Sequence, residues 1–436
     1  MTVITRFAPS PTGFFHAGSY RTAVFAYLFA RHNKGTFMLR IEDTDRARST
    51  KEYEDNIIET LTWLGLENDI FVRQSERVGE HERALRDLVQ AGHAYVSKEK
   101  GEDGVERELI RFKNPGKSVT FTDAIRGDIT FDTTDLKDFV IAKSFSEPLF
   151  HFVVVYDDAA AGVTHVIRGE DHISNTPRQM LIYEALGKPI PIYAHLPLVL
   201  AADRSKLSKR KGARPLLEYR AEGYLPEAIL NYITMVGWNP GTDEELFTKA
   251  QLIERFDLAQ VQKSGAVYDE VKLKWFNREH MLRLTDDEFL AQAKKFSDIL
   301  EIVPALLPII RERVSTFGEI SEMEKAGEFE YFIKAPQVKP AELAWKKEPD
   351  LAKTGERLER SLSLLNAMGT SDWSVTSLRD ALMPYAEEVG KGNVLWPLRY
   401  ALTGKEKSPD PFTVAAILGK DETLKRITDA RAGIGA

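Results

Sequence analysis

Hydrophobic and polar positions in the N-terminal part of the chain alternate between short apolar runs and longer segments with helical spacing. The apolar runs predict strands at residues 3–8, 36–41 and 70–73. Between them, apolar residues recur at helical spacing over residues 18–32 and 51–64, which predicts two helices. Because strands that alternate with helices form parallel sheets with helical crossovers, this pattern predicts a doubly wound α/β sheet.

The pattern changes between about residues 95 and 148, where short alternating strands such as 119–121 and 128–131 are separated by Gly, Asp and Pro. This segment is typical of an α+β insertion. The α/β pattern then returns, with strands expected at 151–156 (HFVVVY), 163–168 and within 192–200, and a helix expected at 175–186. From about Leu216 onward the chain is predicted to be mostly helical.

Composition narrows the class of protein. The chain is 43% hydrophobic and 29% charged, which excludes collagen-like, low-complexity and disordered classes. Its formal net charge of −7 does not by itself indicate a nucleic-acid or membrane partner, although phosphate recognition needs only a local basic patch. The absence of cysteine excludes disulfide scaffolds, thiol catalysis and Cys-ligated metal sites. With no signal-like start and no long apolar run, we expect a cytoplasmic protein without a membrane segment.

A Pro- and Gly-rich turn between the first predicted strand and helix is a candidate phosphate site. Residues 9–13 (PSPTG) are followed by His16, Gly18 and Ser19 at the start of the helix. Ligands of doubly wound sheets bind beyond the carboxyl ends of the strands, and a helix N-terminus attracts phosphate. Gly18 would let the backbone approach a nucleotide, and His16 can donate a hydrogen bond to a phosphate oxygen. Taken alone, the motif favours the alternative interpretation, a Pro- and Gly-rich turn that carries a surface histidine.

A second candidate phosphate site is basic. Residues 206–214 contain five Lys and Arg side chains and no acid. A solvated loop is the alternative interpretation of this run. Two separated phosphate contacts suit transfer at the α-phosphate of ATP, because fixed donors and lysines neutralise the charge that builds on phosphorus and pyrophosphate.

Together these residues resemble the class I aminoacyl-tRNA synthetases. Residues 16–19 (HAGS) are similar to the first signature of that class and residues 206–210 (KLSKR) to the second. Four further stretches, in order along nearly the whole chain, resemble bacterial glutamyl-tRNA synthetases: 6–13 (RFAPSPTG), 40–49 (RIEDTDRARS), 164–179 (THVIRGEDHISNTPRQ) and 398–412 (LRYALTGKEKSPDPF). The resemblance implies ATP-dependent attachment of L-glutamate to the 3′ end of tRNA(Glu) through glutamyl-adenylate, with release of pyrophosphate and AMP.

The resemblance implies a glutamate site formed by Arg6, Ser10, Glu42, Phe150 and Arg168. The residue types fit, because arginine forks bind carboxylates and an acid can hold the ammonium. An internal salt bridge between Arg6 and Glu42 is the alternative. Phe150 stands where the family commonly has a tyrosine, which leaves the polar detail of that wall open.

The resemblance likewise implies an ATP site. Its expected members are His16, Gly18, Ser19, His172, Lys206, Ser208, Lys209 and Arg210. Of these, His16, Lys206 and Lys209 are the expected catalytic residues, which would stabilise the transition state of activation. Mg²⁺ should arrive with ATP, because it keeps most of its waters and binds phosphates readily. No protein metal site and no zinc are expected. Asp43, Asp45, Asp157 and Asp158 are interpreted as turn caps and partners of arginines.

The implied organisation is a Rossmann-type catalytic domain, an α+β insertion and two mostly helical domains. The expected ranges are 1–75 and 149–214 for the catalytic domain, 76–148 for the acceptor-end-binding insertion, 215–314 for the stem-contact domain and 315–436 for the anticodon-binding domain. A single-stranded 3′ end could be held there by phosphate contacts and by stacking on Phe112, and the basic candidates are Arg107, Arg111, Lys113 and Lys117. Solvated charges on a β-rich domain are an equally weighted alternative. A monomer is expected, and charging of tRNA(Gln) stays open.

Two other functions are alternatives to this one. A shortened paralogue that attaches glutamate to a modified tRNA base usually lacks the helical C-terminal block that is present here. A catalytically inactive tRNA-binding module would be favoured by loss of His16, Arg168 or Lys209, and all three are present.

Overall fold

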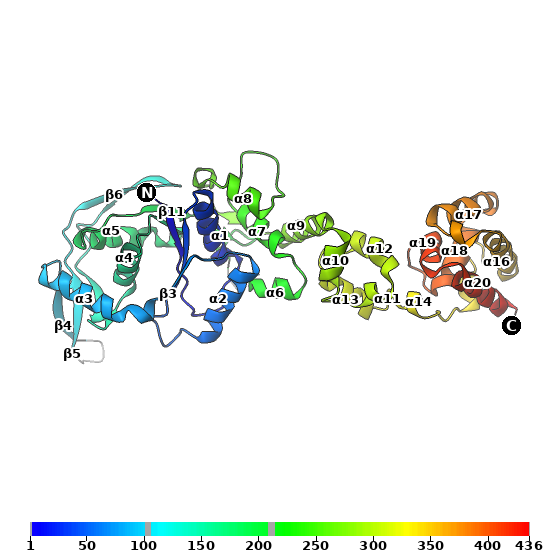
Figure 1. The fold of residues 1–436 in the computed structure, drawn as a ribbon, viewed down its shortest axis with the longest axis horizontal. Helices are drawn as coiled ribbons and strands as arrows, with labels where there is room; N and C mark the ends of the chain where they lie inside the picture. Colours follow the sequence, from blue (N-terminus) through cyan, green and yellow to red (C-terminus); the bar gives the residue numbers. More distant parts are fainter. Residues whose placement is uncertain (1, 101–105, 208–213, 436) are drawn as a thin grey trace. The chain divides into compact units, whose positions relative to one another are not determined.

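The computed structural model describes residues 2–100, 106–207 and 214–435. These residues form two compact units, 1–280 and 281–436 (Figure 1). The four-domain division expected from the sequence divides the chain more finely and stays a prediction. No helix in the described ranges is both long and apolar enough to cross a membrane.

Five parallel strands form the centre of the first unit. They are β1 (Ile4–Phe7), β2 (Thr36–Ile41), β3 (Ile70–Arg73), β10 (His165–Gly169) and β11 (Ile192–Leu196). β2 pairs with β1 and β3, and β10 pairs with β11, all in parallel register. β10 also lies beside β1, since the Thr164 backbone N–H donates to the Ile4 carbonyl at 2.9 Å. The resulting order, β3-β2-β1-β10-β11, confirms the predicted doubly wound sheet.

Helices cover both faces of this sheet. They are α1 (Ala17–His32), α2 (Lys51–Trp63), α3 (Val78–Gln90), α4 (Phe150–Ala160) and α5 (Thr176–Ala185), with 3₁₀ turns η1 (Gln74–Arg77) and η2 (Glu170–Asn175). Alternate strand residues point to opposite faces. Ile167 and Ala194 belong to the core around α1, whereas Val166 and Tyr193 belong to the core around α3 to α5. Figure 1 shows α1 on one side of the strands and α4 and α5 on the other.

The predicted strand at residues 151–156 is wrong, because this segment lies inside helix α4. In the run HFVVVY, polar residues do not alternate with apolar ones. A short continuous apolar run can be a buried strand or a buried helix, and the sequence pattern does not separate them. In α4, four successive residues from Phe152 to Val155 are buried, so packing against other elements outweighs the β-propensity of valine.

The insertion folds as antiparallel sheets. Their strands are β4 (Ala94–Lys100), β5 (Glu106–Phe112), β6 (Ser118–Asp123), β7 (Gly127–Asp132), β8 (Phe139–Ser144) and β9 (Glu147–Pro148). β4, β5, β8 and β9 form one sheet, and β6 and β7 form a hairpin, as the α+β prediction requires. Phe112 is 3% exposed and stacks on Phe139, so the expectation that it stacks on a nucleic-acid base is wrong. Apolar packing of Phe112 and Ile110 with Ile141 and Leu85 holds this part of the chain together.

The rest of the first unit is mostly helical. It contains β12 (Val199–Leu200), α6 (Leu216–Ala221), α7 (Pro226–Met235), α8 (Lys249–Arg255), η4 (Leu258–Gln260), β13 (Ala266–Val267) and α9 (Glu270–Arg283), and the boundary between the units falls within α9. α7 and α8 pack against α1.

The described part of the second unit consists of helices and 3₁₀ turns. These are α10 (Asp286–Ala293), α11 (Ile299–Ile302), η5 (Pro304–Leu306), α12 (Leu307–Arg313), α13 (Gly318–Lys325), α14 (Glu330–Ile333), α15 (Pro340–Leu343), α16 (Leu351–Asn366), η6 (Thr370–Asp372), α17 (Val375–Val389), α18 (Lys391–Thr403), α19 (Pro411–Leu418) and α20 (Lys420–Ile434). A core around Leu358, Leu382, Leu398 and Ile427 joins α16 to α20. The predicted helical character of this region is confirmed.

Candidate active site

A cavity of about 460 Å³ opens beyond the carboxyl ends of β1, β2 and β10 in the first unit. It is lined by every predicted site residue that the structure describes: Arg6, Ser10, His16, Gly18, Ser19, Glu42, Phe150, Arg168, His172 and Lys206. The remaining three, Ser208, Lys209 and Arg210, lie outside the described residues. Segments far apart in the sequence therefore meet at the edge of the sheet where ligands of doubly wound folds bind.

His16 caps the N-terminus of α1. Its Nδ1 accepts a hydrogen bond from the Gly18 backbone N–H at 3.1 Å, so in the neutral ring Nε2 carries the proton. A Cβ on Gly18 would lie 3.1 Å from two atoms of the His16 ring, so glycine lets the imidazole pack closely on the helix end. Sequence reasoning assigned Gly18 to nucleotide approach and did not foresee this contact. The capped helix end, with its positive dipole, lines the cavity.

Two arginines and two carboxylates form a buried cluster at the cavity wall. Both oxygens of Asp158 lie 3.2 Å from Arg6 Nε, and its Oδ1 lies 2.6 Å from Arg40 Nη1. Arg40 Nη2 donates to Glu42 Oε1 at 3.0 Å. Arg6 and Glu42 thus bind different partners, and the direct Arg6–Glu42 salt bridge that was the alternative interpretation is not formed.

The charges in this cluster set the protonation of its acids. Burial favours the neutral form of Asp158, but Arg40 and Arg6 outweigh it and lower the pKa of this carboxyl. Burial raises the pKa of Glu42, and Arg40 offsets only part of that effect. Asp158 uses only the Nε–H of Arg6, and no other described residue accepts from the terminal nitrogens of that guanidinium. Those nitrogens can therefore bind a ligand in the cavity.

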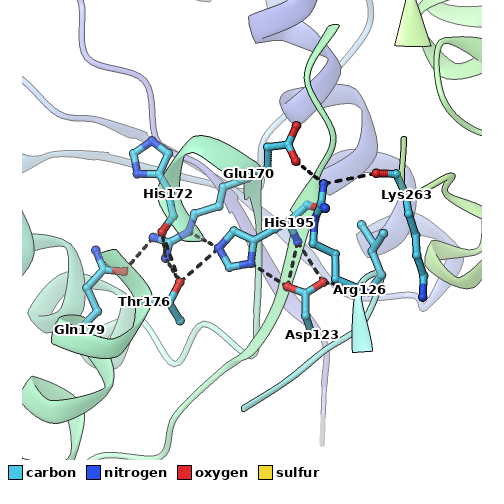
Figure 2. A network of polar contacts seen from close by, with 10 residues as sticks. Asp123, Arg126, Glu170, His172, Thr176, Gln179, His195 and Lys263 are labelled. Carbon is cyan, nitrogen blue, oxygen red and sulfur yellow. Dashed lines mark hydrogen bonds and ion pairs between the residues drawn. The ribbon is translucent and has the colours of Figure 1, made fainter. Parts of the chain in front are cut away.

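Arg168, at the end of β10, is a buried cation whose hydrogen-bond partners are all uncharged (Figure 2). Its Nε donates to His195 Nε2 at 3.1 Å, its Nη1 to Gln179 Oε1 at 2.8 Å, and its Nη2 to Thr176 Oγ1 at 2.9 Å and the His172 carbonyl at 3.4 Å. Arg168 is 6% exposed, and burial lowers its pKa to about 10. Because a buried charge is stabilised by an opposite charge, this arginine favours an anionic ligand.

Phe150 and His172 form an aromatic wall beside Arg168. Phe150 is the first residue of α4, and its ring centre lies 5.7 Å from that of His172. Burial and the nearby Arg168 lower the pKa of His172 to about 4, so this ring is neutral at pH 7. Phe150 contributes surface to the wall and no hydrogen bond.

Lys206 lies at the open side of the cavity. Its Nζ is 3.2 Å from Asp171 Oδ2, and both side chains are at least half exposed. An exposed ion pair of this kind is weak, so a phosphate can replace Asp171 as the partner of Lys206. A neighbouring hollow of about 630 Å³ shares His16, Ser19 and Lys206 with the main cavity, which extends the space available to an elongated ligand.

Three of the four aspartates named in the sequence analysis pair with arginines as predicted, and the fourth, Asp43, binds Ser75 instead. Asp43 accepts hydrogen bonds from Ser75, and Asp45 pairs with Arg48. Asp157 accepts from Gln74, Arg77 and His81, and Asp158 pairs with Arg6 and Arg40. Within the described ranges, no group of three or more His, Cys, Asp or Glu residues is arranged to hold a metal ion.

Sequence reasoning missed the residues that hold the predicted ones in place. Arg40, Thr176 and Gln179 lie within the stretches that carry the family resemblance, and Arg40 shares a strand face with Glu42 two positions on. This spacing was an available signal for Arg40. His195 and its partner Asp123 lie 72 residues apart, and no local pattern links them.

Comparisons with known proteins agree with this geometry. The family model "tRNA synthetases class I (E and Q), catalytic domain" matches residues 2–108 and 97–275, and the model "Anticodon binding domain" matches residues 272–431. The glutamate–tRNA ligase of Aquifex aeolicus (strain VF5) is 40% identical over 98% of both chains. The chain belongs to the glutamate–tRNA ligase family of class I synthetases. The ligase of Xanthomonas axonopodis pv. citri (strain 306), another member, is also 40% identical and aligns over 100% of both chains.

Solved structures of this family share the fold. A glutamate tRNA ligase from Elizabethkingia meningosepticum, crystallised in complex with its amino acid, matches 100% of both chains with a TM-score of 0.86 and 30% identity. The glutamate–tRNA synthetase of Elizabethkingia anophelis matches 99% of this chain and 100% of its own, with a TM-score of 0.83 and 30% identity. The family resemblance inferred from the sequence motifs is thereby confirmed.

Proposed function

We propose that the chain activates L-glutamate with ATP and transfers the glutamyl group to the 3′ end of tRNA(Glu). Activation joins the glutamate carboxylate to the α-phosphate and releases pyrophosphate. The 3′-terminal ribose hydroxyl of the tRNA then attacks the activated carbonyl, and AMP leaves. The observation that carries this proposal is Arg168, a buried cation that has no carboxylate partner among the described residues, in a cavity that Arg6 and Glu42 also line.

The charges around the proposed amino-acid site support an acidic amino acid. In the cluster of Arg6, Arg40, Arg168, Glu42 and Asp158, two ionised carboxylates face three guanidinium groups, which leaves one positive charge. Glutamate carries a net charge of −1 and neutralises it, with carboxylates on Arg6 and Arg168 and the ammonium on Glu42. Glutamine has no side-chain charge and would leave Arg168 uncompensated, so the site favours glutamate. Ser10 and Phe150 complete the proposed glutamate site.

The phosphates of ATP are assigned to the other side of the cavity. The N-terminus of α1, with His16, Gly18 and Ser19, attracts negative charge. Lys206 can bind a phosphate in place of its exposed partner Asp171. With Ser208, Lys209, Arg210 and His172 they form the proposed ATP site. His16, Lys206 and Lys209 would stabilise the charge that develops on phosphorus and pyrophosphate. ATP would enter as its Mg²⁺ complex, because Mg²⁺ prefers phosphate oxygens and water.

Exchange of radiolabelled pyrophosphate into ATP tests this function. We expect exchange with L-glutamate and none with L-glutamine. Exchange is measured with and without tRNA(Glu), because the family resemblance suggests that activation waits for tRNA. Silence with glutamate under both conditions would favour an inactive tRNA-binding module and contradict the proposal. Aminoacylation of purified tRNA(Gln) decides whether this second tRNA is also a substrate. We also propose a monomer, as the family resemblance implies, and a cytoplasmic location. Sedimentation tests the first.

A further inference from the structure

A buried chain of hydrogen bonds connects Arg168 to the insertion (Figure 2). Asp123, at the end of β6, lies 2.6 Å from His195 Nδ1 and 3.1 Å from the His195 backbone nitrogen. On its other side, His195 Nε2 lies 3.1 Å from Arg168 Nε. Asp123 and His195 are buried, and neither is among the described residues that line the cavity. His195 contacts the candidate site through Arg168 and through Thr176, whose Oγ1 lies 3.2 Å from His195 Nε2 and accepts from Arg168 Nη2.

These contacts select one form of the His195 ring. Arginine nitrogens only donate, so His195 Nε2 accepts from Arg168. An ionised Asp123 only accepts, so His195 Nδ1 carries the proton. The ring is therefore neutral with its proton on Nδ1, a form in which each of its nitrogens has a matching partner.

The turn of the same hairpin holds the cavity wall from a second side. Arg126 donates from Nε to the His195 carbonyl at 3.3 Å and forms an ion pair with Glu170. Glu170 Oε1 accepts from the backbone N–H of Leu198 at 2.7 Å, and Leu198 lines the cavity. The β6–β7 hairpin thus contacts β11 at His195 and the chain after β10 at Glu170, and Glu170 in turn binds Leu198 after β11.

We propose that Asp123 and His195 are positioning residues of the amino-acid site. They fix the plane of the Arg168 guanidinium by presenting one lone pair to its Nε–H, and so orient its terminal nitrogens for a substrate carboxylate. This inference rests on the proposed role of Arg168 in glutamate binding.

Asp123→Asn is the sharpest test of this proposal. Asp123 Oδ1 accepts from the backbone N–H groups of Ile125 and Arg126, both at 3.0 Å, so the asparagine oxygen takes this place and its NH₂ faces His195. The His195 backbone N–H then keeps only its 3.3 Å contact to the oxygen, and the ring accepts at Nδ1 and carries its proton on Nε2. That proton can go to Thr176 Oγ1 at 3.2 Å, but the Nε–H of Arg168 loses its acceptor and the guanidinium is no longer held in one plane. Selective ¹⁵N-histidine NMR should show the His195 proton moving from Nδ1 to Nε2.

Steady-state aminoacylation with the full chain and tRNA(Glu) supplies the functional measurement. We expect Asp123→Asn to raise the KM for glutamate roughly tenfold, the effect of one hydrogen bond to a charged group, with the KM for ATP unchanged. His195→Gln keeps an acceptor near the position of Nε2 and should stay close to wild type. His195→Asn is too short to reach Arg168 and should match Asp123→Asn. Equal KM values for glutamate in the two His195 variants would overturn the proposal.

His81→Gln is the matched control. His81 is also fully buried and also pairs with an aspartate, Asp157 at 2.8 Å, but it does not line the cavity. If this variant raises the KM for glutamate as much as His195→Asn, the effect is general loss of packing and the proposal is overturned. Arg168→Lys separates the two hypotheses. If Arg168→Lys leaves the KM for glutamate unchanged, the proposed glutamate site is contradicted. If Arg168→Lys raises this KM but Asp123→Asn and His195→Asn do not, only the positioning role is contradicted.

Discussion

Asp158 is a carboxylate shared by two arginines that come from neighbouring strands, Arg6 in β1 and Arg40 in β2. All three side chains are at most 5% exposed. Because the arginines cannot lose their protons at neutral pH, their burial costs free energy, and the opposite charge of Asp158 compensates for this cost. The residue thereby holds Arg6 at the cavity and Arg40 next to Glu42.

We expect Asp158→Asn to lower the free energy of unfolding by about 3 kcal/mol at pH 7, since breaking a buried ion pair leaves uncompensated charge. The pKa of Asp158 is lower in the folded chain than in the unfolded chain. Its stabilisation is therefore complete above about pH 4 and lost as the pH falls through the folded-state pKa. Urea unfolding at several pH values measures both effects, and the gap between wild type and variant should shrink in acid. Asp45→Asn, which breaks an exposed pair with Arg48, should leave stability unchanged. Equal stability of the two variants would contradict this account of Asp158.

A second residue-scale prediction concerns the basic motif. Lys209→Ala should lower the rate of glutamate activation roughly 10²–10³-fold, because a fixed positive charge no longer meets the developing charge on the phosphates. Single-turnover formation of glutamyl-tRNA measures this rate. Lys211→Ala, two positions on in the same basic run, serves as the control and should change the rate far less. Near-normal aminoacylation by Lys209→Ala would refute its catalytic role.

At the scale of elements, the connection between α1 and β2 depends on close contact with the start of the chain. A Cβ on Gly35 would lie 2.3 Å from the Val3 carbonyl oxygen, which itself accepts the Thr36 backbone N–H at 2.8 Å. The end of the first helix therefore reaches the edge of β1 through a residue without a side chain. This contact sets the register in which β2 lies beside β1.

Gly35→Ala should consequently destabilise the chain by about 1–3 kcal/mol, the usual range for forcing an atom into a filled space. Gly79→Ala is the control, because a Cβ at this position in α3 meets nothing within 4 Å. Alanine favours helices over glycine, so the control should unfold at the same urea concentration as wild type or a higher one. A Gly35→Ala chain as stable as Gly79→Ala would show that the backbone there adjusts freely.

At the scale of the whole molecule, the two units have separate cores. Buried residues of the first unit form clusters around α1 and around α3 to α5, whereas the cluster around Leu398 and Ile427 contains only residues of the second unit. Separate cores allow local unfolding of one unit without the other.

Leu398→Ala should therefore destabilise only the second unit, by about 2–5 kcal/mol. Leu398 is 2% exposed, so its truncation leaves a cavity in that core. Hydrogen–deuterium exchange followed by mass spectrometry should show faster exchange in peptides from residues 331–434, which form this core, and wild-type exchange in residues 1–280. Faster exchange across both units would contradict this separation.

The sequence predicts much of this molecule because its strongest signals are local. Periodicity predicts the first and last residues of β2 and β3 correctly. The sequence motifs identify site residues, and all of those that the structure describes line one cavity. Two kinds of feature are not local. The run HFVVVY is a helix because other elements bury it, and Asp158, His195 and Asp123 act through partners that only the folded chain brings near. Pattern and spacing carry no record of such contacts.

The hairpin contacts of Asp123 and Arg126 matter for protein engineering. A chimaera that exchanges residues 76–148 as an independent module would also exchange the two side chains that brace His195 and Glu170. The ends of the exchanged segment therefore do not coincide with the boundary of the proposed amino-acid site. A transplanted insertion must keep an acid at the end of β6 and a guanidinium in its turn, or the host pocket must be redesigned with it.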